Sequence, residues 1–344
     1  MQINKSLGRL AYNVIVTSMI LLFSLAQNST TRAQDRTAYV ETFEFSLDAP
    51  LPLALTAGSL QATLVQTIDT SQFSPPSPDP TGITYLPTAN TLLMSDSEVE
   101  EMPDLFAGAN LFEATLSGSL VHTSNTINFS NEPTGAAFDS SNAHVFFSDD
   151  GRDRIFDVNP GADGRYGTTD DIVTSIDTRA FGSDDPEGVA IDSQQRRLFI
   201  ADATDGKVYR VSAGANAIFD GVPPAGDDVV TQFDTGALGL QAPQGIEFDP
   251  LNRHLYLVGL PPTVVAEVTI AGKLVQMIDI SAATAHRPAG LTLGPGTLDP
   301  LGRSFYIVDR GVDNDTNPDE NDGKLYEFSL PRPKVIFLPV IIDQ

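Results

Sequence analysis

The sequence has no cysteine and no tryptophan, and it is poor in basic residues. Without cysteine, the chain can form no disulfide, no thiolate metal site and no cysteine nucleophile. Lysine and arginine number 20 against 45 aspartates and glutamates, a formal net charge of −25. Phosphate backbones and anionic lipids repel such a charge, so we expect no nucleic-acid partner and no electrostatic binding to membranes. Hydrophobic residues still make up 41% of the chain, enough for a packed core.

Long apolar runs are also scarce. Beyond residue 33, none reaches the ~18–20 residues that a membrane-spanning helix needs. The one extended run, residues 11–26, follows Lys5 and Arg9 and precedes small residues at 31–33, a layout typical of a secretory signal peptide. We therefore expect residues 1–33 to be removed. Because cysteine is absent, we expect a bacterial protein that is secreted, periplasmic or held at the cell surface.

An internal repeat runs through the rest of the chain. Its signature is Pro, any residue and Gly followed by alternating apolar positions, and it starts at Pro80, Pro133, Pro186, Pro243 and Pro288. Each unit continues with further alternating runs rich in Val, Ile, Phe and Tyr, separated by Gly, Asp, Asn or Pro. This pattern predicts four short antiparallel strands per unit. Units of this kind and length are typical of the blades of a β-propeller, so the predicted fold is all-β.

The sequence leaves two blade numbers open. The length of the mature chain, 34–344, divided by the repeat period favours six blades in a single domain, the sixth built from residues 34–79 and the tail at 333–343. The alternative is five blades, with residues 62–70 completing the last blade and residues 39–58 forming an extension. In both arrangements, strands from the N- and C-terminal parts of the chain close the ring.

Two of the units carry a resemblance to known families. PEGVAIDSQQRRLFIADATDGKVYRVS (186–212) and PQGIEFDPLNRHLYLVG (243–259) resemble repeats of the six-bladed, TolB-like propellers of the NHL, SdiA-regulated and gluconolactonase-like groups. The resemblance covers residues 80–330 and implies a propeller fold. These groups include metal-dependent lactonases, a lyase, phytase-like phosphatases and binding modules. The lactonases hold a divalent metal in the central channel, and Glu187 matches one of their ligand positions.

Aspartate recurs at the end of the second predicted strand of four units, as Asp96, Asp149, Asp202 and Asp309. In one interpretation, these side chains accept hydrogen bonds from the backbone of the following turns. In the other, they line one mouth of the ring and hold a hard cation. The second interpretation would make Asp149, Asp202 and Asp309, together with Glu187, candidates for catalysis. The standard catalytic sequence motifs are absent.

Acidic loops are the stronger metal candidates. The loop at 313–323 alternates acidic and amide side chains, and its candidate ligands are Asp313, Asp315, Asn317, Asp319, Asn321 and Asp322. The loop at 161–171 supplies Asp163, Asp170 and Asp171, and its counterpart at 214–228 also ends in a pair of aspartates. Closely spaced oxygen ligands can wrap Ca²⁺. Solvated turns without an ion are the other interpretation of all three loops.

Two functions are compatible with these features. The first, which we favour, is a secreted binding or scaffold module, stabilised by Ca²⁺ in its acidic loops. We expect a monomer whose partner is an extracellular protein, a glycan or a small molecule. The alternative is a metal-dependent hydrolase of the lactonase or phosphoesterase type, with a cation in the channel that polarises the substrate and activates water.

Overall fold

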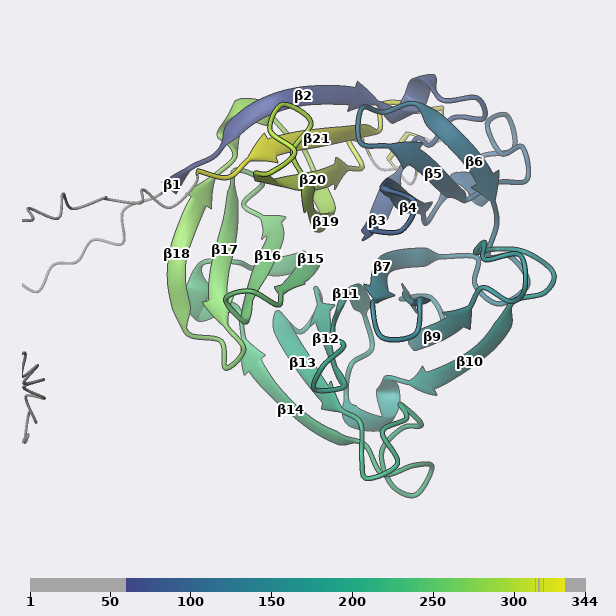
Figure 1. Cartoon of the computed structure of the whole chain (residues 1–344), viewed down its shortest axis with the longest axis vertical. Helices are drawn as coiled ribbons and strands as arrows, with labels where there is room; N and C mark the ends of the chain where they lie inside the picture. The colour runs from purple at the N-terminus through teal and green to yellow at the C-terminus, as the bar shows by residue number, and fades with distance from the viewer. Residues whose placement is uncertain (1–59, 313, 315, 318, 332–344) are drawn as a thin grey trace, which may run out of the picture. The chain divides into compact units, whose positions relative to one another are not determined.

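Each repeat unit folds into a four-stranded antiparallel sheet, and five such sheets surround a central axis as the blades of a β-propeller (Figure 1). The computed structural model describes residues 60–312, 314, 316–317 and 319–331. In every blade the strand that begins with the Pro-x-Gly signature lies innermost, and the later strands follow outward in order. The predicted all-β propeller of four-stranded blades is thereby confirmed.

The first four blades are built from consecutive strands. The first contains β3 (Pro80–Leu86), β4 (Thr91–Asp96), β5 (Leu111–Thr115) and β6 (Leu120–Ser124). The second contains β7 (Pro133–Asp139), β8 (His144–Asp149), β9 (Arg154–Asn159) and β10 (Ile172–Asp177). The third contains β11 (Pro186–Asp192), β12 (Arg197–Asp202), β13 (Lys207–Ser212) and β14 (Val229–Asp234). The fourth contains β15 (Ala242–Asp249), β16 (His254–Leu260), β17 (Val264–Thr269) and β18 (Leu274–Asp279), with the two-residue β1 (Leu60–Gln61) paired parallel to β18.

The fifth blade joins strands from both ends of the propeller. It contains β19 (Pro288–Pro295), β20 (Arg303–Asp309), β21 (Lys324–Ser329) and, outermost, β2 (Thr63–Asp69). β2 pairs antiparallel with β21, so that Thr63 lies opposite Ser329 and Asp69 opposite Lys324. The Lys324 ammonium also donates to the Asp69 carboxylate at 2.6 Å. This pairing closes the ring.

The preferred prediction of six blades was wrong, and the alternative of five is what the described residues form. The stretch assigned to a sixth blade, residues 34–79, instead contributes β2 to the fifth. β2 occupies the outer edge that the fifth unit leaves open, because that unit supplies only three strands of its own. The predicted extension at 39–58 and the tail at 333–343 lie outside the described residues.

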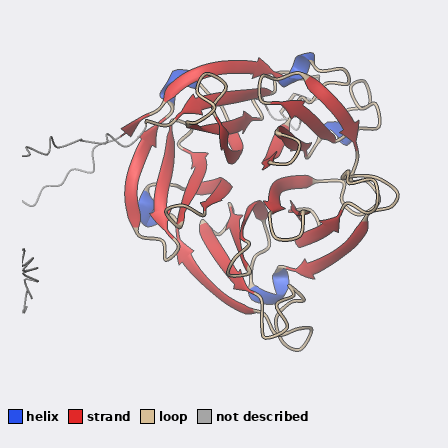
Figure 2. Cartoon of the chain, viewed as in Figure 1, coloured by secondary structure: helices blue, strands red, loops and turns tan. Residues whose placement is uncertain are grey.

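Helical structure is confined to short turns between strands (Figure 2). Within the described ranges these are the 3₁₀ turns η1 (Thr70–Gln72), η2 (Val99–Glu101), η3 (Arg179–Phe181), η4 (Gly236–Leu238) and η5 (Ser281–Ala283). All except η2 directly follow the outermost strand of a blade and lead into the next blade. None of the helices in this part of the protein has the length and apolar character needed to cross a membrane.

The glycine of each Pro-x-Gly signature marks a point where neighbouring inner strands nearly touch. A Cβ atom added to Gly135 would lie 2.5 Å from the carbonyl oxygen of Glu187, and one added to Gly188 would lie 2.6 Å from that of Gln244. The same contact continues around the ring, with Gly82 against Gly135, Gly245 against Ala289 and Gly290 against Thr81. Only glycine fits where backbones approach this closely. The repeat therefore encodes the packing of five strands around one axis.

Hydrophobic clusters fill the five interfaces between neighbouring blades. Strands in the middle of a blade are buried on both faces, which explains their nearly continuous apolar sequences, whereas the outermost β10 is largely exposed. Ion pairs add to three of these interfaces. The buried aspartate that ends an inner strand meets an arginine of the following blade, in the pairs Asp139–Arg196, Asp192–Arg253 and Asp249–Arg303.

We expect Gly188→Ala to destabilise the propeller by roughly 1–3 kcal/mol or more, because the new methyl group must push two inner strands apart. Gly236→Ala is the matched control, since a Cβ there meets no atom within 4 Å. Denaturant titration of both variants measures the effect. Equal stabilities for the two variants would show that the inner strands leave room for a methyl group at residue 188.

Candidate functional site

The central axis has two chemically different ends. The inner strands begin at one end with the Pro-x-Gly signature, and there five carboxylates of the second and third blades come together. We call this group the acidic mouth: Glu132, Asp149, Asp150, Asp185 and Glu187. At the other end, where the inner strands finish, lies an axial cavity of about 510 Å³.

The acidic mouth consists of two overlapping groups of ligand atoms. One carboxylate oxygen from each of Glu132, Asp149 and Asp150 lies within 4.8 Å of the others, and the same holds for Asp150, Asp185 and Glu187. Glu187 lies on β11 and Asp149 ends β8, whereas the other three lie in the turns beside β7, β8 and β11. Asp150 belongs to both groups, so the two neighbouring blades form one continuous patch of negative charge.

Neighbouring polar groups hold the acidic mouth in place without neutralising it. The Thr134 hydroxyl donates to Asp150 at 2.8 Å, and the backbone N–H of Thr204 donates to Asp185 at 2.7 Å. The Gln244 amide, one blade further on, donates to Glu187 at 3.1 Å. Arg152 pairs with Asp149 at 3.1 Å. Among the described ion pairs, no lysine or arginine meets the other four carboxylates of the mouth.

Burial and mutual repulsion disfavour the charged state of these groups. The Glu187 side chain is buried, and this burial, followed by the charges of Asp150 and Asp185, raises its pKa well above the usual range. Burial also raises the pKa of Glu132 and of Asp150, and further carboxylates add to each shift. A positive ion placed in the mouth would relieve this repulsion.

Glu100, in η2 of the first blade, extends the negative field toward Glu132. Burial raises the pKa of Glu100 to about 8, with smaller contributions from the charges of Asp96, Glu101 and Glu132. Both of its carboxylate oxygens are buried and lack a hydrogen-bond partner.

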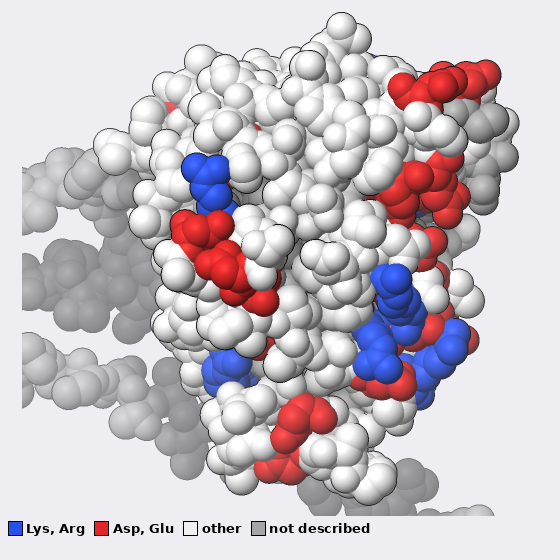
Figure 3. All heavy atoms as spheres, turned by 90° about the vertical axis from the view of Figure 1, so that its right-hand side faces the viewer, with Lys and Arg blue, Asp and Glu red and all other residues white. Residues whose placement is uncertain are grey.

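Acidic side chains are also unevenly distributed over the surface of the protein. On the face drawn in Figure 3, Asp and Glu form several separate groups.

The aspartates that end the second strands make regular contacts with the chain around them. Asp96, Asp149 and Asp202 each accept a 2.7 Å hydrogen bond from a serine hydroxyl 19 residues earlier in the sequence, from Ser77, Ser130 and Ser183 respectively. Their second oxygen accepts backbone N–H groups of the following turn. These are the contacts of the turn interpretation. The three serines were missed by the sequence analysis, although they repeat at the 53-residue interval of the neighbouring Pro-x-Gly signatures.

Asp309 is held differently, because the unit before it lacks the serine. It accepts backbone N–H groups from His286 at 3.0 Å and Arg287 at 2.7 Å, and the Tyr326 hydroxyl donates to it at 3.2 Å. Of the four catalytic candidates, Glu187 and Asp149 lie in the acidic mouth, while Asp202 and Asp309 are not among the carboxylates that converge there.

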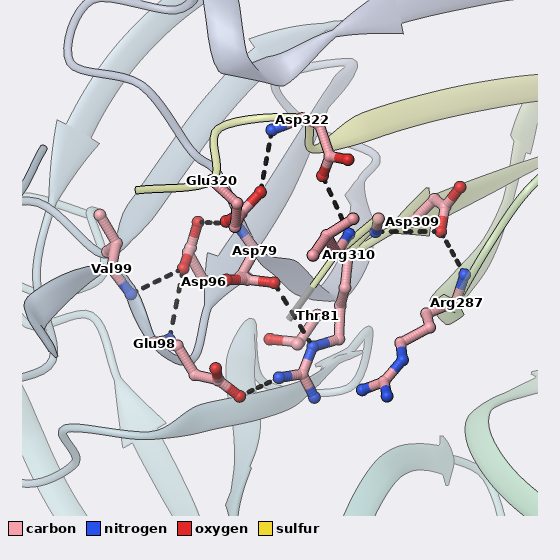
Figure 4. A network of polar contacts seen from close by, with 12 residues as sticks. Asp79, Thr81, Asp96, Glu98, Val99, Arg287, Asp309, Arg310, Glu320 and Asp322 are labelled. Atoms are coloured by element: carbon pink, nitrogen blue, oxygen red, sulfur yellow. Dashed lines mark hydrogen bonds and ion pairs between the residues drawn. The ribbon is translucent and has the colours of Figure 1, made fainter. Parts of the chain in front are cut away.

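A further polar network joins the first blade to the fifth (Figure 4). Arg310 follows β20 and pairs with Glu98, and its Nε atom lies 3.7 Å from the Asp79 carboxylate. Glu320 is buried beside this pair. Burial, followed by the negative charge of Asp79, raises the pKa of Glu320. The network therefore includes a buried acidic residue from the loop that was predicted to bind Ca²⁺.

In the predicted calcium loop at 313–323, the described candidates form hydrogen bonds within the loop and to neighbouring segments. Asp313 and Asp315 lie outside the described residues. Among the other four, Asn317 accepts from the Asp319 N–H at 3.4 Å, the Asn321 amide donates to the Ser71 carbonyl at 3.3 Å, and Asp322 accepts from the Val312 N–H at 3.1 Å. A calcium site there stays a prediction.

The two related loops of the second and third blades differ. In the loop at 161–171, Asp170 accepts from the N–H groups of Ala162 and Asp163, and Asp171 accepts from those of Gly167 and Thr168. The carboxylates of this loop are not among the described groups whose oxygens converge within 4.8 Å. In the loop at 214–228, for which the sequence analysis named no individual ligands, three carboxylates do converge.

The axial cavity is mainly apolar, and its acidic lining residues are Asp192, Glu247 and Asp249 of the inner strands. All five inner strands contribute to its walls, which include Tyr85, Phe138, Phe248 and Leu293. Glu247 of β15 also lines it. Burial raises the pKa of Glu247 to about 8; the charge of Asp249 adds to the shift, while Thr292 and Arg303 oppose it. The size and lining are those of a small-molecule pocket.

Proteins similar to this chain are found among solved structures. No protein-family model matches the sequence, and no curated protein does. Among solved structures, regucalcin from Agrobacterium tumefaciens, described as a calcium-binding protein, is similar with a TM-score of 0.45 and 12% identity, covering 79% of this chain and 96% of that one. Streptogramin B lyase has a TM-score of 0.38 and 16% identity, over 79% and 87%. The PQQ-bound aldose sugar dehydrogenase of Streptomyces coelicolor has a TM-score of 0.43 and 13% identity, over 78% and 98%. All three are β-propellers. Sequence identities and TM-scores this low do not indicate a shared function, so the function of this protein has to be inferred from its own residues.

Glu247 predicts a pH dependence of stability. Its pKa is raised in the folded state, so its contribution is complete below the unfolded value of about 4.3 and is lost as the pH rises toward about 8. We therefore expect Glu247→Gln to gain stability relative to the wild type between pH 5 and 8.5. Denaturant titrations at both pH values measure this, with the exposed Asp104→Asn as control. If the free energy of unfolding of Glu247→Gln differed from that of the wild type by the same amount at both pH values, the raised pKa of Glu247 would be contradicted.

Proposed function

We propose that this protein is an exported β-propeller that binds Ca²⁺ at its acidic mouth and uses this end of the ring to bind an extracellular ligand. The observation that carries the proposal is the convergence of carboxylates from two neighbouring blades. Glu132, Asp150, Asp185 and Glu187 contribute oxygens to groups no wider than 4.8 Å, and no described ion pair neutralises these four.

The residues present fit a hard divalent cation. Ca²⁺ takes six to eight oxygen ligands from carboxylates, carbonyls and water. The mouth offers carboxylates and, beside them, the hydroxyl of Thr134 and the side-chain amide of Gln244. A bound Ca²⁺ would neutralise part of the negative charge and attract oxygen atoms of a ligand, such as hydroxyl or carboxylate groups. Weak sites, with dissociation constants of about 10⁻⁴–10⁻³ M, are typical of extracellular calcium modules.

The neighbouring side chains would orient the carboxylates for this task. Gln244 holds one oxygen of Glu187, and Thr134 holds one oxygen of Asp150, so that each carboxylate keeps a second oxygen. Because Gln244 belongs to the fourth blade and Glu187 to the third, the site depends on the packing of neighbouring blades. The preference for a binding module over an enzyme rests on the absence of the standard catalytic motifs from the sequence.

A metal-dependent hydrolase is the second candidate, and one observation favours it. Glu187, the position that resembles a lactonase ligand, lies in the channel mouth among carboxylates that could hold a cation. Assays with lactones and phosphoesters, in the presence of Ca²⁺, Mg²⁺ or Mn²⁺, separate the two candidates. If the wild type hydrolyses one of these substrates and Glu187→Gln does not, the protein is a hydrolase and the proposal of a binding module is wrong.

The acidic mouth yields a direct prediction for metal binding. We expect the double variant Asp150→Asn/Glu187→Gln to weaken Ca²⁺ binding at the mouth at least tenfold, because it removes two groups that can bind the ion as carboxylates while keeping both hydrogen-bond acceptors. Isothermal titration calorimetry on the purified protein measures the affinity, with Asp104→Asn as the control. An unchanged binding isotherm in the double variant would remove the mouth as a calcium site.

Export is part of the proposal and has its own test. We expect the full-length chain, expressed in a bacterial host with a C-terminal tag, to be recovered outside the cytoplasm with a new N-terminus near Gln34. N-terminal sequencing of the recovered protein decides this. Recovery of the uncleaved chain from the cytoplasm alone would contradict export.

A further inference from the structure

The loop between β13 and β14, residues 214–228, gathers three carboxylates on the third blade. One oxygen from each of Asp220, Asp227 and Asp228 lies within 4.8 Å of the others. Asp220 and Asp227 are exposed, whereas Asp228 is only 3% exposed. The loop joins the third and fourth strands of its blade, so it lies at the opposite end of the blade from the acidic mouth.

A buried oxygen of Asp228 lacks the partner that such an atom normally has. Its Oδ2 atom accepts a hydrogen bond from the Gly221 N–H at 2.8 Å. Its Oδ1 atom is buried and has no hydrogen-bond partner. Among the described ion pairs, none involves a carboxylate of this loop. A buried carboxylate oxygen without a hydrogen bond or counter-charge is costly, and a cation is the partner that would satisfy it.

The loop already holds the three carboxylates against one another. Asp220 accepts from the Asp227 N–H at 3.1 Å and from the Asn216 amide at 2.7 Å, and Asp227 accepts from the Ala215 N–H at 2.8 Å. Glycines make room for them: a Cβ on Gly226 would collide with the Asp220 carboxylate, and one on Gly214 with that of Asp227.

Phe219 fastens the loop to the interface between the second and third blades. The ring is buried, packs edge-on against Phe146 at 5.6 Å, and lies under the Arg196 guanidinium at 4.9 Å. Arg196 also donates to the Ala217 carbonyl at 3.3 Å. The carboxylates therefore stand on an anchored segment, which lowers the entropic cost of organising ligands around an ion.

We propose that the loop at 214–228 binds one Ca²⁺ through Asp220, Asp227 and Asp228, as a site separate from the acidic mouth. Three carboxylates match the preference of Ca²⁺ for charged oxygen ligands, and backbone carbonyls and water would complete the coordination. The ion supplies the missing partner of the buried Asp228 oxygen. The site does not depend on cation binding at the mouth, so either can fail alone.

Asp228→Asn tests the site in the full chain. Asn keeps the oxygen that accepts the Gly221 N–H but removes the charge that a cation needs. Calcium titration by calorimetry and thermal melts in Ca²⁺ and in EDTA are the measurements. Asp104→Asn is the control, because Asp104 is an exposed aspartate that lies outside the converging groups and outside the three acidic loops. The double variant Asp150→Asn/Glu187→Gln removes carboxylates of the acidic mouth, so that Ca²⁺ binding by the loop can be measured separately.

We expect Asp228→Asn to bind one Ca²⁺ fewer, or to bind it at least tenfold more weakly, while Asp104→Asn binds as the wild type. We also expect the stability order to reverse: Asp228→Asn melts at or above the wild-type temperature in EDTA and below it in Ca²⁺. The mouth variant should retain the loop site. Unchanged binding in Asp228→Asn, or an equal loss in Asp104→Asn, would overturn the proposal.

Discussion

The close approach of five backbones around the axis is the constraint on which the rest of this molecule depends. At each Pro-x-Gly signature the glycine lets the next inner strand come within a distance that no Cβ would allow. This contact sets the radius of the ring and hence the fit of the clusters between blades. It also places the residue before each glycine at the mouth of the channel, so that Glu187 and Gln244 meet across two blades.

The acidic residues of the chain have two distinct roles, one in stabilising the fold and one in offering negative charge to a cation. The hydrogen-bond and ion-pair partners of each residue distinguish the two roles. Aspartates at strand ends accept hydrogen bonds from serine and backbone or pair with arginine, and thereby fasten turns and neighbouring blades. Others, such as Asp150 and Asp185, are oriented by neutral donors that leave their charge in place. A strongly acidic composition thus conceals a division between carboxylates that complete the fold and carboxylates that remain available to a cation.

Sequence reasoning reached the repeat and the four strands per blade, because each leaves a periodic pattern in one stretch of chain. It considered residues 62–70 as the strand that completes the last blade only in its five-blade alternative. It preferred six blades, since length alone cannot tell that β2 fills an edge of the fifth blade. Glu187 was found through the resemblance to the lactonases, which implied a metal ligand at this position. Asp185 and Glu132 were not, because they lie in turns and approach Asp150 only when the second and third blades stand side by side.

Closing the ring with β2 also has a consequence for how the chain reaches its native state. Asp69 and Lys324, which pair across the closure, are 255 residues apart in the sequence. Long-range pairing of this kind slows folding, because most of the chain must be ordered before the contact can form. The edge of β21 stays unpaired until that moment and can accept a strand from another molecule. Dilution, or a factor that shields this edge, should therefore raise the yield of refolded protein.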